Sequence, residues 1–278
     1  MVAFVVLHYK NIKDTIECLD SIKKLSNQDK IRIVVVDNNS LIDSEVEMLK
    51  RYTEDIILLD DNLGFAKANN IGCKYAVKNY NPDFVCVINN DTIIYQKDFV
   101  EEIFKMYDMH CFDMLGPKID SPIGESVNPF PVFKTKEEVV NEISKCQKLI
   151  KIYDSFLLTL LLTIYVKLKR VFVKPKVAMN GYKIETNVAL HGCAIIFSKK
   201  YVQKYRNVFY EKTFLFHEEE FLYQRLLRDK QVSIYDPNLK IFHKEGSSVK
   251  TKMKSNRKSK LFRESERLKS LKLLLREM

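Results

Sequence analysis

The chain has 278 residues, of which 46% are hydrophobic, and it carries a formal net charge of +10. This length fits one or two domains, and the apolar content excludes disorder for most of the chain. The six cysteines form no Cys-x-x-Cys pair, which argues against a zinc ribbon or a disulfide framework, and buried free thiols fit a reducing compartment.

Residues 1–120 alternate between two sequence patterns. Apolar β-type runs predict strands, and apolar residues at three- and four-residue spacing predict helices. The strands are expected at 2–8, 31–36, 55–59 and 84–89, and the helices at 12–25, 43–51, 65–79 and 98–107. This alternation predicts βαβ units and a mostly parallel sheet. The short apolar start lacks a basic lead, so we expect no signal peptide.

Three of the expected strands end in polar clusters. His8 and Tyr9 follow the first, residues 37–40 follow the second, and Asn89-Asn90-Asp91 follows the fourth. Ligands of open α/β sheets bind just past the carboxyl ends of the strands, so we expect a site at this edge. A lone acid such as Asp91 can hold a divalent cation, which can hold a diphosphate. A turn rich in Asn and Asp is the alternative.

The middle of the chain reads differently. After a short strand expected at 115–119 and a proline-rich loop at 121–132, residues 133–175 predict a helical insertion. Its most apolar part, 156–166, is too short by about half to span a bilayer. Cations flank this part, which favours an interfacial helix lying on a membrane. A helix packed on the domain is the alternative.

Residues 187–250 return to the α/β pattern. A glycine-interrupted strand is expected at 187–198, a helix after Tyr201, and a second helix from Glu218 to about Arg228. The strand-like run 239–242 then leads to His243.

The tail, residues 251–278, is dense in Lys and Arg. Four leucines in it share one helical face, which predicts an amphipathic helix; they are Leu261, Leu268, Leu271 and Leu275. We expect this helix to bind an anionic bilayer, while docking on the catalytic domain or on a second subunit stays open.

Four segments, in this order, resemble the family-two nucleotide-sugar glycosyltransferases, in the rhamnosyltransferase-like branch. They are 34–40 (VVVDNNS), 62–72 (NLGFAKANNIG), 89–91 (NND) and 214–220 (FLFHEEE). The resemblance covers about 1–125 and 185–250. It implies the GT-A fold: an α/β domain over 1–250, with a mixed, mostly parallel sheet flanked by helices, a helical insertion at about 133–175, and the basic helical tail 251–278.

The resemblance also implies nucleotide contacts. Asp37 would accept a hydrogen bond from the ring imide of uracil or thymine, with an Asx turn or a helix cap as the alternative role. The segment from Gly64 opens a helix near the nucleotide. The expected nucleotide-sugar contacts are His8, Tyr9, Asp37, Asn39, Gly64, Phe65, Lys67, Asn70 and Asn90. Simple packing is the alternative for Phe65.

Asn89-Asn90-Asp91 resembles a metal-binding Asp-x-Asp motif whose first acid is Asn. Asp91 would then bind Mn²⁺ or Mg²⁺, since hard cations prefer oxygen ligands and bridge phosphate oxygens. His243, in a His-x-x-Gly-x-Ser pattern, is expected to be a second metal ligand. A structural histidine at a strand end is its alternative role.

Glu218, Glu219 and Glu220 follow an aromatic run and resemble the family's catalytic acids. Crowded like charges and burial raise a carboxylate's pKa, which suits a general base. The resemblance places the base at Glu219 and a supporting acid at Glu218. His191 and Gly192 would lie at the acceptor edge, where Gly192 permits close backbone approach.

Together these residues predict an inverting transfer from a UDP- or dTDP-sugar to a hydroxyl of a saccharide acceptor. The basic charge and the apolar stretch suggest a lipid-linked acceptor at the inner face of the cell membrane, in surface polysaccharide synthesis such as that of a capsule. A homodimer stays open, and we expect no nucleic-acid partner. The rival class is a non-enzymatic membrane-surface or nucleic-acid binding protein that uses the basic tail.

Overall fold

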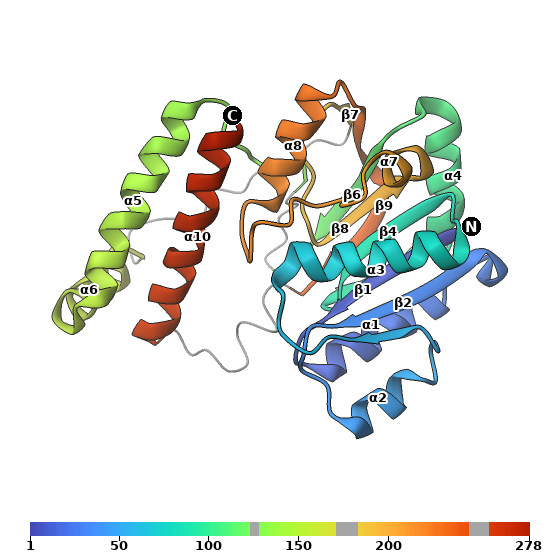
Figure 1. Cartoon of the computed structure of the whole chain (residues 1–278), viewed down its shortest axis with the longest axis horizontal. Helices are drawn as coiled ribbons and strands as arrows, with labels where there is room; N and C mark the ends of the chain where they lie inside the picture. Colours follow the sequence, from blue (N-terminus) through green and yellow to red (C-terminus); the bar gives the residue numbers. More distant parts are fainter. Residues whose placement is uncertain (123–127, 171–182, 245–255) are drawn as a thin grey trace.

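The computed structural model describes residues 1–122, 128–170, 183–244 and 256–278, with the backbone alone over 165–170. An α/β domain occupies most of the chain, and two long helices, α5 and α10, lie side by side next to it (Figure 1). The predicted GT-A boundary near 250 lies outside the described residues.

A mixed sheet forms the centre of the α/β domain. Its strands run in the order β3-β2-β1-β4-β8-β6-β9-β5, with β7 paired to β9. The neighbours of β1 are parallel to it, while β8 runs antiparallel to β4 and β6. The strands are β1 Val2–His8, β2 Ile31–Asp37, β3 Ile56–Leu58, β4 Phe84–Asn89, β5 Thr92–Ile93, β6 Met114–Asp120, β7 Glu185–Thr186, β8 Ala194–Ser198 and β9 Ser233–His243.

Helices cover both faces of this sheet. The helices of the described residues are α1 Ile12–Lys23, α2 Asp43–Leu49, α3 Gly64–Tyr80, α4 Phe99–His110, α5 Lys136–Asp154, α6 Phe156–Arg170, α7 Lys199–Lys204, α8 Glu218–Arg228 and α10 Arg257–Glu277, with a 3-10 turn at Gln28–Lys30. Of these, α5, α6 and α10 lie beside the sheet rather than on its faces. Alternate residues of β1 serve two cores, because successive strand side chains point to opposite faces. Phe4 packs with Leu19 of α1, whereas Val5 packs with Ala68 of α3. The sequence prediction of a sheet flanked by helices is confirmed.

The strand predicted over 187–198 was wrong in its first half, because β8 begins only at Ala194. The preceding residues form a turn whose amides bond to side chains rather than to a neighbouring strand. The N–H of Gly192 donates to Glu219, and the N–H of Cys193 donates to the ring of His191. The turn thereby becomes a wall of the pocket described below.

The tail contains the helix α10. Its apolar stripe packs against α5 and α8, in a cluster with Val139 and Phe221 at its centre. Leu271 and Leu274 are fully buried there. Docking on the chain itself, one of the open alternatives, therefore accounts for this stripe. Residues 251–255 of the predicted tail lie outside the described residues.

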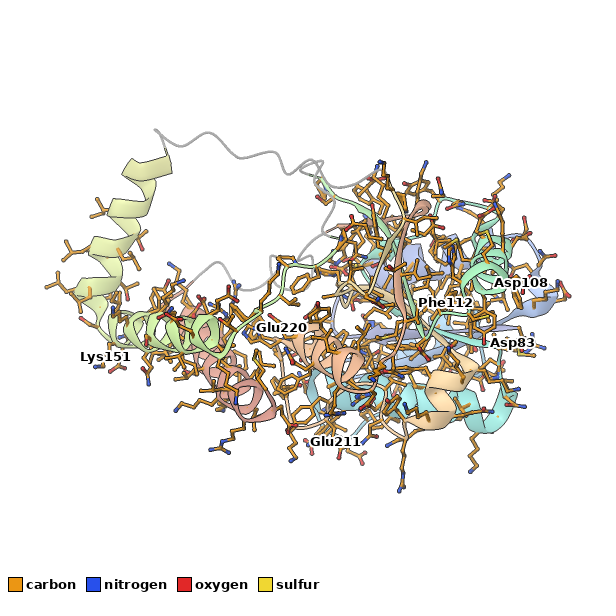
Figure 2. All side chains as sticks on the ribbon, turned by 90° about the horizontal axis from the view of Figure 1, so that it is seen from above. Asp83, Asp108, Phe112, Lys151, Glu211 and Glu220 are labelled. Carbon is orange, nitrogen blue, oxygen red and sulfur yellow. The ribbon has the colours of Figure 1, made fainter. Side chains whose placement is uncertain are left out.

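Helix α6 carries the largest group of exposed apolar side chains among the described residues. Figure 2 shows α6 turning away from the rest of the molecule just after Lys151, with its side chains projecting outward. The exposed residues are Phe156, Leu157, Leu158, Leu160, Leu161 and Ile164, between 45% and 74% exposed. Within the described ranges, no helix is long and apolar enough to cross a bilayer.

Candidate active site

The polar clusters predicted at the strand ends meet at one edge of the sheet. Strand register pairs His8 of β1 with Asp37 of β2, and Leu7 of β1 with Asn89 of β4. Because these three strands are parallel, their carboxyl ends share one edge. The edge predicted from sequence is therefore the one that gathers these residues.

The carboxylate of Asp37 is held by its own turn. It accepts hydrogen bonds from the N–H and hydroxyl of Ser40, at 2.9–3.1 Å, and from the N–H of Leu41 at 3.2 Å. These are local contacts, to residues three and four positions on, of the kind that the structural alternative for Asp37 predicts. Next to it, Nδ1 of buried His8 lies 2.6 Å from the hydroxyl of Thr15, and burial lowers the pKa of His8.

Asn38, which the sequence analysis passed over, ties two motif segments together. Its side-chain amide donates to Oδ1 of Asn62 at 2.8 Å, and its Oδ1 accepts from the N–H of Leu63 at 2.8 Å. Asn39, in a left-handed conformation with φ 60°, donates to the carbonyl of Asp60 at 2.8 Å. The turn after β2 is therefore fixed against the start of α3.

Gly64 sits where two loops touch. Its φ is +80°, and a Cβ there would lie 2.2 Å from the carbonyl oxygen of Phe214, so only glycine fits. The N–H of Phe65 donates to the same carbonyl at 3.0 Å. The segment expected at the nucleotide thereby contacts the segment that leads to the three acids at 218–220.

Three expected nucleotide contacts have other roles. Lys67 is exposed on α3 and does not line the pocket. The amide of Asn70 both donates to and accepts from the backbone of Phe209, at 3.0 and 2.9 Å. Asn90 donates to the hydroxyl of Thr15 at 2.9 Å. The side chains of Asn70 and Asn90 are therefore engaged by the protein itself.

Asp91 and His243 form a buried pair. Oδ1 of Asp91, the residue before β5, lies 3.1 Å from Nε2 of His243, the last residue of the neighbouring strand β9. Two ligands on adjacent corners of an octahedral site, each about 2.1 Å from the ion, lie about 3 Å apart, so the pair fits a divalent cation. No cluster of three His, Cys, Asp or Glu side chains suited to a metal occurs in the described ranges, so other ligands would have to come from a diphosphate or water. Gly246 and Ser248 of the motif after His243 lie outside the described residues.

The three acids open α8 after a turn with unusual backbone geometry. Phe216 and His217 both have positive φ, 74° and 70°. Such conformations in non-glycine residues cost energy and concentrate at functional sites. They set the entry to the helix so that Glu218 and Glu220 are buried, with Glu220 3.0 Å from Nδ1 of His217.

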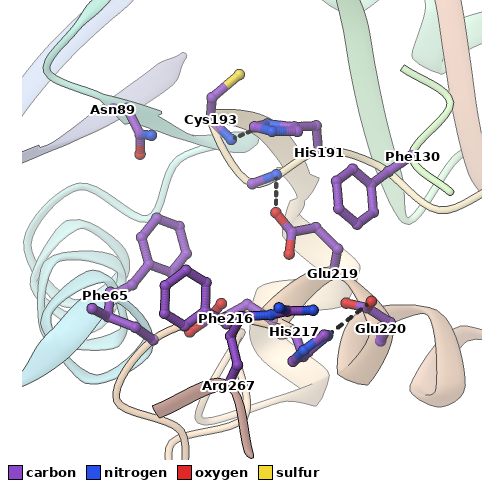
Figure 3. Close-up of a pocket in the computed structure, with 13 residues that line it drawn as sticks. Phe65, Asn89, Phe130, His191, Cys193, Phe216, His217, Glu219, Glu220 and Arg267 are labelled. Atoms are coloured by element: carbon purple, nitrogen blue, oxygen red, sulfur yellow. Dashed lines mark hydrogen bonds and ion pairs between the residues drawn. The ribbon is translucent and has the colours of Figure 1, made fainter. Parts of the chain in front are cut away.

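Glu219 points across the pocket to the turn before β8. Its Oε1 accepts a hydrogen bond from the N–H of Gly192 at 3.0 Å (Figure 3). Burial, with repulsion from Glu220, raises the pKa of Glu219 to about 7. Burial, with repulsion from Glu219, raises the pKa of Glu218 to about 8. A carboxyl group whose pKa is near neutrality is suited to take up a proton.

His191 connects the acids to the Asp91–His243 pair. Its Nδ1 accepts from the N–H of Cys193 at 3.0 Å, and its ring centre lies 5.8 Å from that of His243. Burial, with the nearby His243, lowers the pKa of His191 to about 4, so the ring is neutral. The residues expected at the acceptor, the base and the metal therefore adjoin one another.

A pocket of about 350 Å³ is lined by His191, Gly192 and the three acids at 218–220; Asp91 and His243 lie next to His191 but do not line it. Figure 3 shows Glu219 between His191 on one side and Phe216 on the other. Its lining includes residues that the sequence analysis did not select, namely Phe130, Leu215, Phe216, His217 and Arg267. Leu215, Phe216 and His217 belong to the segment 214–220, whereas no motif marks Phe130 or Arg267. Arg267 comes from α10. This helix carries many Lys and Arg residues, and the sequence does not distinguish Arg267 from the others.

Residues 3–159 match the family model described as glycosyl transferase family 2. A curated relative, the low-salt glycan biosynthesis hexosyltransferase Agl10 of Haloferax volcanii, is 27% identical over 131 residues, which cover 46% of this chain and 40% of Agl10. The chain thus matches less than half the length of this curated relative.

Solved structures share the fold. Residues 1–349 of S. aureus TarS superpose with a TM-score of 0.53 at 16% identity, over 87% of this chain and 60% of that one. The mannosyltransferase PcManGT of Pyrobaculum calidifontis, in complex with GDP-Man and Mn²⁺, gives 0.52 at 14% identity, over 87% and 56%. At these identities the likeness shows the fold alone.

Proposed function

Because the chain belongs to glycosyl transferase family 2, we propose that it transfers a sugar from a nucleotide sugar to a hydroxyl of a saccharide acceptor. The observation that carries this proposal is the position and raised pKa of Glu219. Its carboxylate has a pKa of about 7, is oriented by Gly192, and lines the pocket that Asn89 also lines at the carboxyl edge of the sheet.

In the proposed reaction Glu219 takes the proton of the acceptor hydroxyl. The hydroxyl oxygen forms a bond to the anomeric carbon as the bond from that carbon to the diphosphate oxygen breaks, and the nucleoside diphosphate leaves. Attack opposite the leaving group inverts the anomeric centre. Glu218, whose pKa is about 8, stays protonated near neutral pH, which limits the negative charge beside the base.

Asp91 and His243 would hold Mn²⁺ or Mg²⁺. The cation would neutralise charge on the departing diphosphate. Support comes from the spacing of the two side chains and from the Mn²⁺ in the PcManGT complex, a protein of the same fold. The neutral ring of His191 beside His243 adds no positive charge that would oppose cation binding.

For the donor we propose a UDP- or dTDP-sugar at the edge formed by β1, β2 and the start of α3. Asp37 remains the proposed acceptor for the ring imide, and the other proposed contacts are His8, Tyr9, Asn39, Gly64 and Phe65. A solved structure of TarS contains UDP, with a TM-score of 0.54 to this chain.

We also propose a lipid-linked acceptor and an enzyme bound to the inner face of the cell membrane, in surface polysaccharide synthesis. The apolar face of α6 supports this. The last turns of α5, directly before it, carry exposed Lys148 and Lys151, and Arg257 of α10 donates to the carbonyl of Asp154 at the α5–α6 junction. Apolar side chains bordered by cations suit an anionic bilayer. The membrane contact predicted for the tail stripe is therefore proposed for α6 instead.

A panel of UDP-, dTDP- and GDP-sugars, each with and without Mn²⁺, tests the function by release of the nucleoside diphosphate. We expect release from UDP- or dTDP-sugars that depends on the metal, and stabilisation against heat by UDP or dTDP. Absence of both, together with salt-sensitive binding to duplex DNA, would instead support the non-enzymatic rival.

A further inference from the structure

Helix α10 reaches the pocket although it lies outside the matched residues 3–159. Arg267 lines the pocket, and Figure 3 shows it on the opposite side from His191 and Cys193. Three residues further on, the hydroxyl of Ser270 donates to the carbonyl of Leu215 at 2.9 Å, which fixes the loop before the acids against α10. One wall of the pocket therefore belongs to this chain's own C-terminal helix.

Two carboxylates hold the guanidinium of Arg267 in place. One of its terminal nitrogens donates to Glu142 of α5 at 2.7 Å, and the other donates to Glu264 of α10 at 2.9 Å. The Arg267 side chain is 25% exposed. A guanidinium has five N–H donors in a rigid plane. The bonds to Glu142 and Glu264 therefore fix the directions of the N–H donors that are not used in them.

The charge of this region disfavours an anionic ligand. Glu142 and Glu264 offset the positive charge of Arg267, and the pocket contains three further acids at 218–220. A phosphate or carboxylate entering here would meet more negative than positive charge. A ligand with hydroxyl groups can accept from Arg267 and donate to carboxylates without that repulsion. Phe130 and Phe216 supply apolar surface for the carbon face of such a ligand.

We propose that Arg267, Phe130 and Phe216 form a subsite for an uncharged sugar residue of the acceptor, with Arg267 donating to its hydroxyl oxygens. The inference rests on the proposed glycosyl transfer and adds a class of substrate to it: the acceptor ends in a neutral sugar rather than a uronic acid or a phosphate. It also makes Arg267 a residue that determines acceptor specificity.

The test uses the full chain, the best donor from the nucleotide-sugar panel, and octyl glycosides as acceptor probes. Each neutral glycoside is paired with its uronic acid, so that the pair differs only at C6. We expect a neutral glycoside to raise nucleoside diphosphate release, and its uronic acid to need at least about 10-fold higher concentration. Equal use of both members, or no stimulation by any neutral glycoside over the donor's own hydrolysis, would overturn the inference and leave the donor chemistry standing.

Arg267→Lys keeps the charge but loses the planar fork. We expect the KM for the neutral glycoside to rise about 10-fold while kcat changes less than about 3-fold. The control is Arg263→Lys, the same change one turn earlier at an exposed position, which should leave both constants unchanged. If Arg267→Lys fails to fold, Phe130→Leu replaces it, with the same expected rise in KM. An unchanged KM in the folded variant refutes the subsite, whereas a panel with no nucleoside diphosphate release at all refutes the proposed function.

Discussion

The N–H of Gly192 donates to Oε1 of Glu219 over 3.0 Å, and a Cβ added to Gly192 would lie 2.9 Å from that same oxygen. The glycine thus orients the proposed base and leaves room for it. The clash would fall on the end of a flexible side chain rather than on backbone, so substitution should affect catalysis more than folding.

We therefore expect Gly192→Ala to lower turnover by about 10- to 100-fold, because the carboxylate is displaced from its position. Its free energy of unfolding should change by no more than about 1 kcal/mol. Steady-state rates and urea titration measure the two effects. Gly64→Ala is the contrast: with φ +80° and a Cβ 2.2 Å from a backbone oxygen, it should cost at least about 2 kcal/mol of stability. Equal losses of stability in the two variants would contradict this reading.

Glu219→Gln removes the proposed base and keeps its shape. We expect turnover to fall by about 10²- to 10⁴-fold, as for loss of a general base. Binding of UDP or dTDP, measured by calorimetry, should persist, since Glu219 is not among the proposed nucleotide contacts. Glu211→Gln, an exposed acid on the same segment, serves as the control. Near-normal turnover in Glu219→Gln would end the assignment.

The pH dependence of turnover should follow the same carboxylate. A base acts only when deprotonated, so with a pKa of about 7 the rate should rise from about pH 6 to pH 8. Glu220 is the neighbouring charge that raises this pKa. Its removal in Glu220→Gln favours the ionised form of Glu219 and should move the rising limb toward lower pH. A limb that stays in place, or moves to higher pH, would show that another group titrates.

Asp91→Asn should abolish the dependence on metal. The amide is neutral, and the remaining imidazole of His243 is a weak ligand for a hard cation. We expect Mn²⁺ to enhance the thermal stabilisation by UDP in the unchanged protein but not in this variant. Asp120→Asn, a half-buried acid at the end of β6, is the control. A variant that keeps its Mn²⁺ response would place the metal elsewhere.

Membrane binding should depend on α6. Leu161→Glu is expected to reduce sedimentation with phosphatidylglycerol vesicles by about 10-fold, because the side chain would no longer enter the bilayer surface. The control is Leu58→Glu on β3, because Leu58 is 55% exposed and Leu161 is 54% exposed. This variant should sediment with the vesicles as the unchanged protein does. If neither protein sediments and Leu161→Glu instead converts a dimer to a monomer, the α6 face is an interface between copies.

The sheet was predictable because its signals are local. Each of the first strands is an apolar run that ends in polar residues, and their parallel register brings Asp37 and Asn89 to the same edge. The turn at Gly192 was not predictable as a break in the strand, since its amide bonds to Glu219, 27 residues away.

Residues of the candidate site were predictable only where they belong to a sequence motif. Glu219 and Asp91 stand in motifs, and the structure brings them to neighbouring parts of one edge. Asn70 also stands in a motif, yet its amide is used by the backbone of Phe209, 139 residues on. The sequence alone does not show whether a buried amide such as that of Asn70 binds a ligand or bonds to the protein backbone. Arg267 has no motif and reaches the pocket only through the packing of α10 on α5.

The contact between Ser270 and Leu215 bears on how this protein matures. A growing chain that has left the ribosome as far as residue 244 already contains the proposed base, metal ligands and nucleotide contacts, but not Arg267. The loop before the acids, however, has no α10 to hold it until some 30 residues later. The α/β domain can fold during synthesis, as domains generally do. We expect nascent chains arrested before α10 to bind nucleotide but to transfer sugar poorly, so that catalytic competence arrives as a late event in translation.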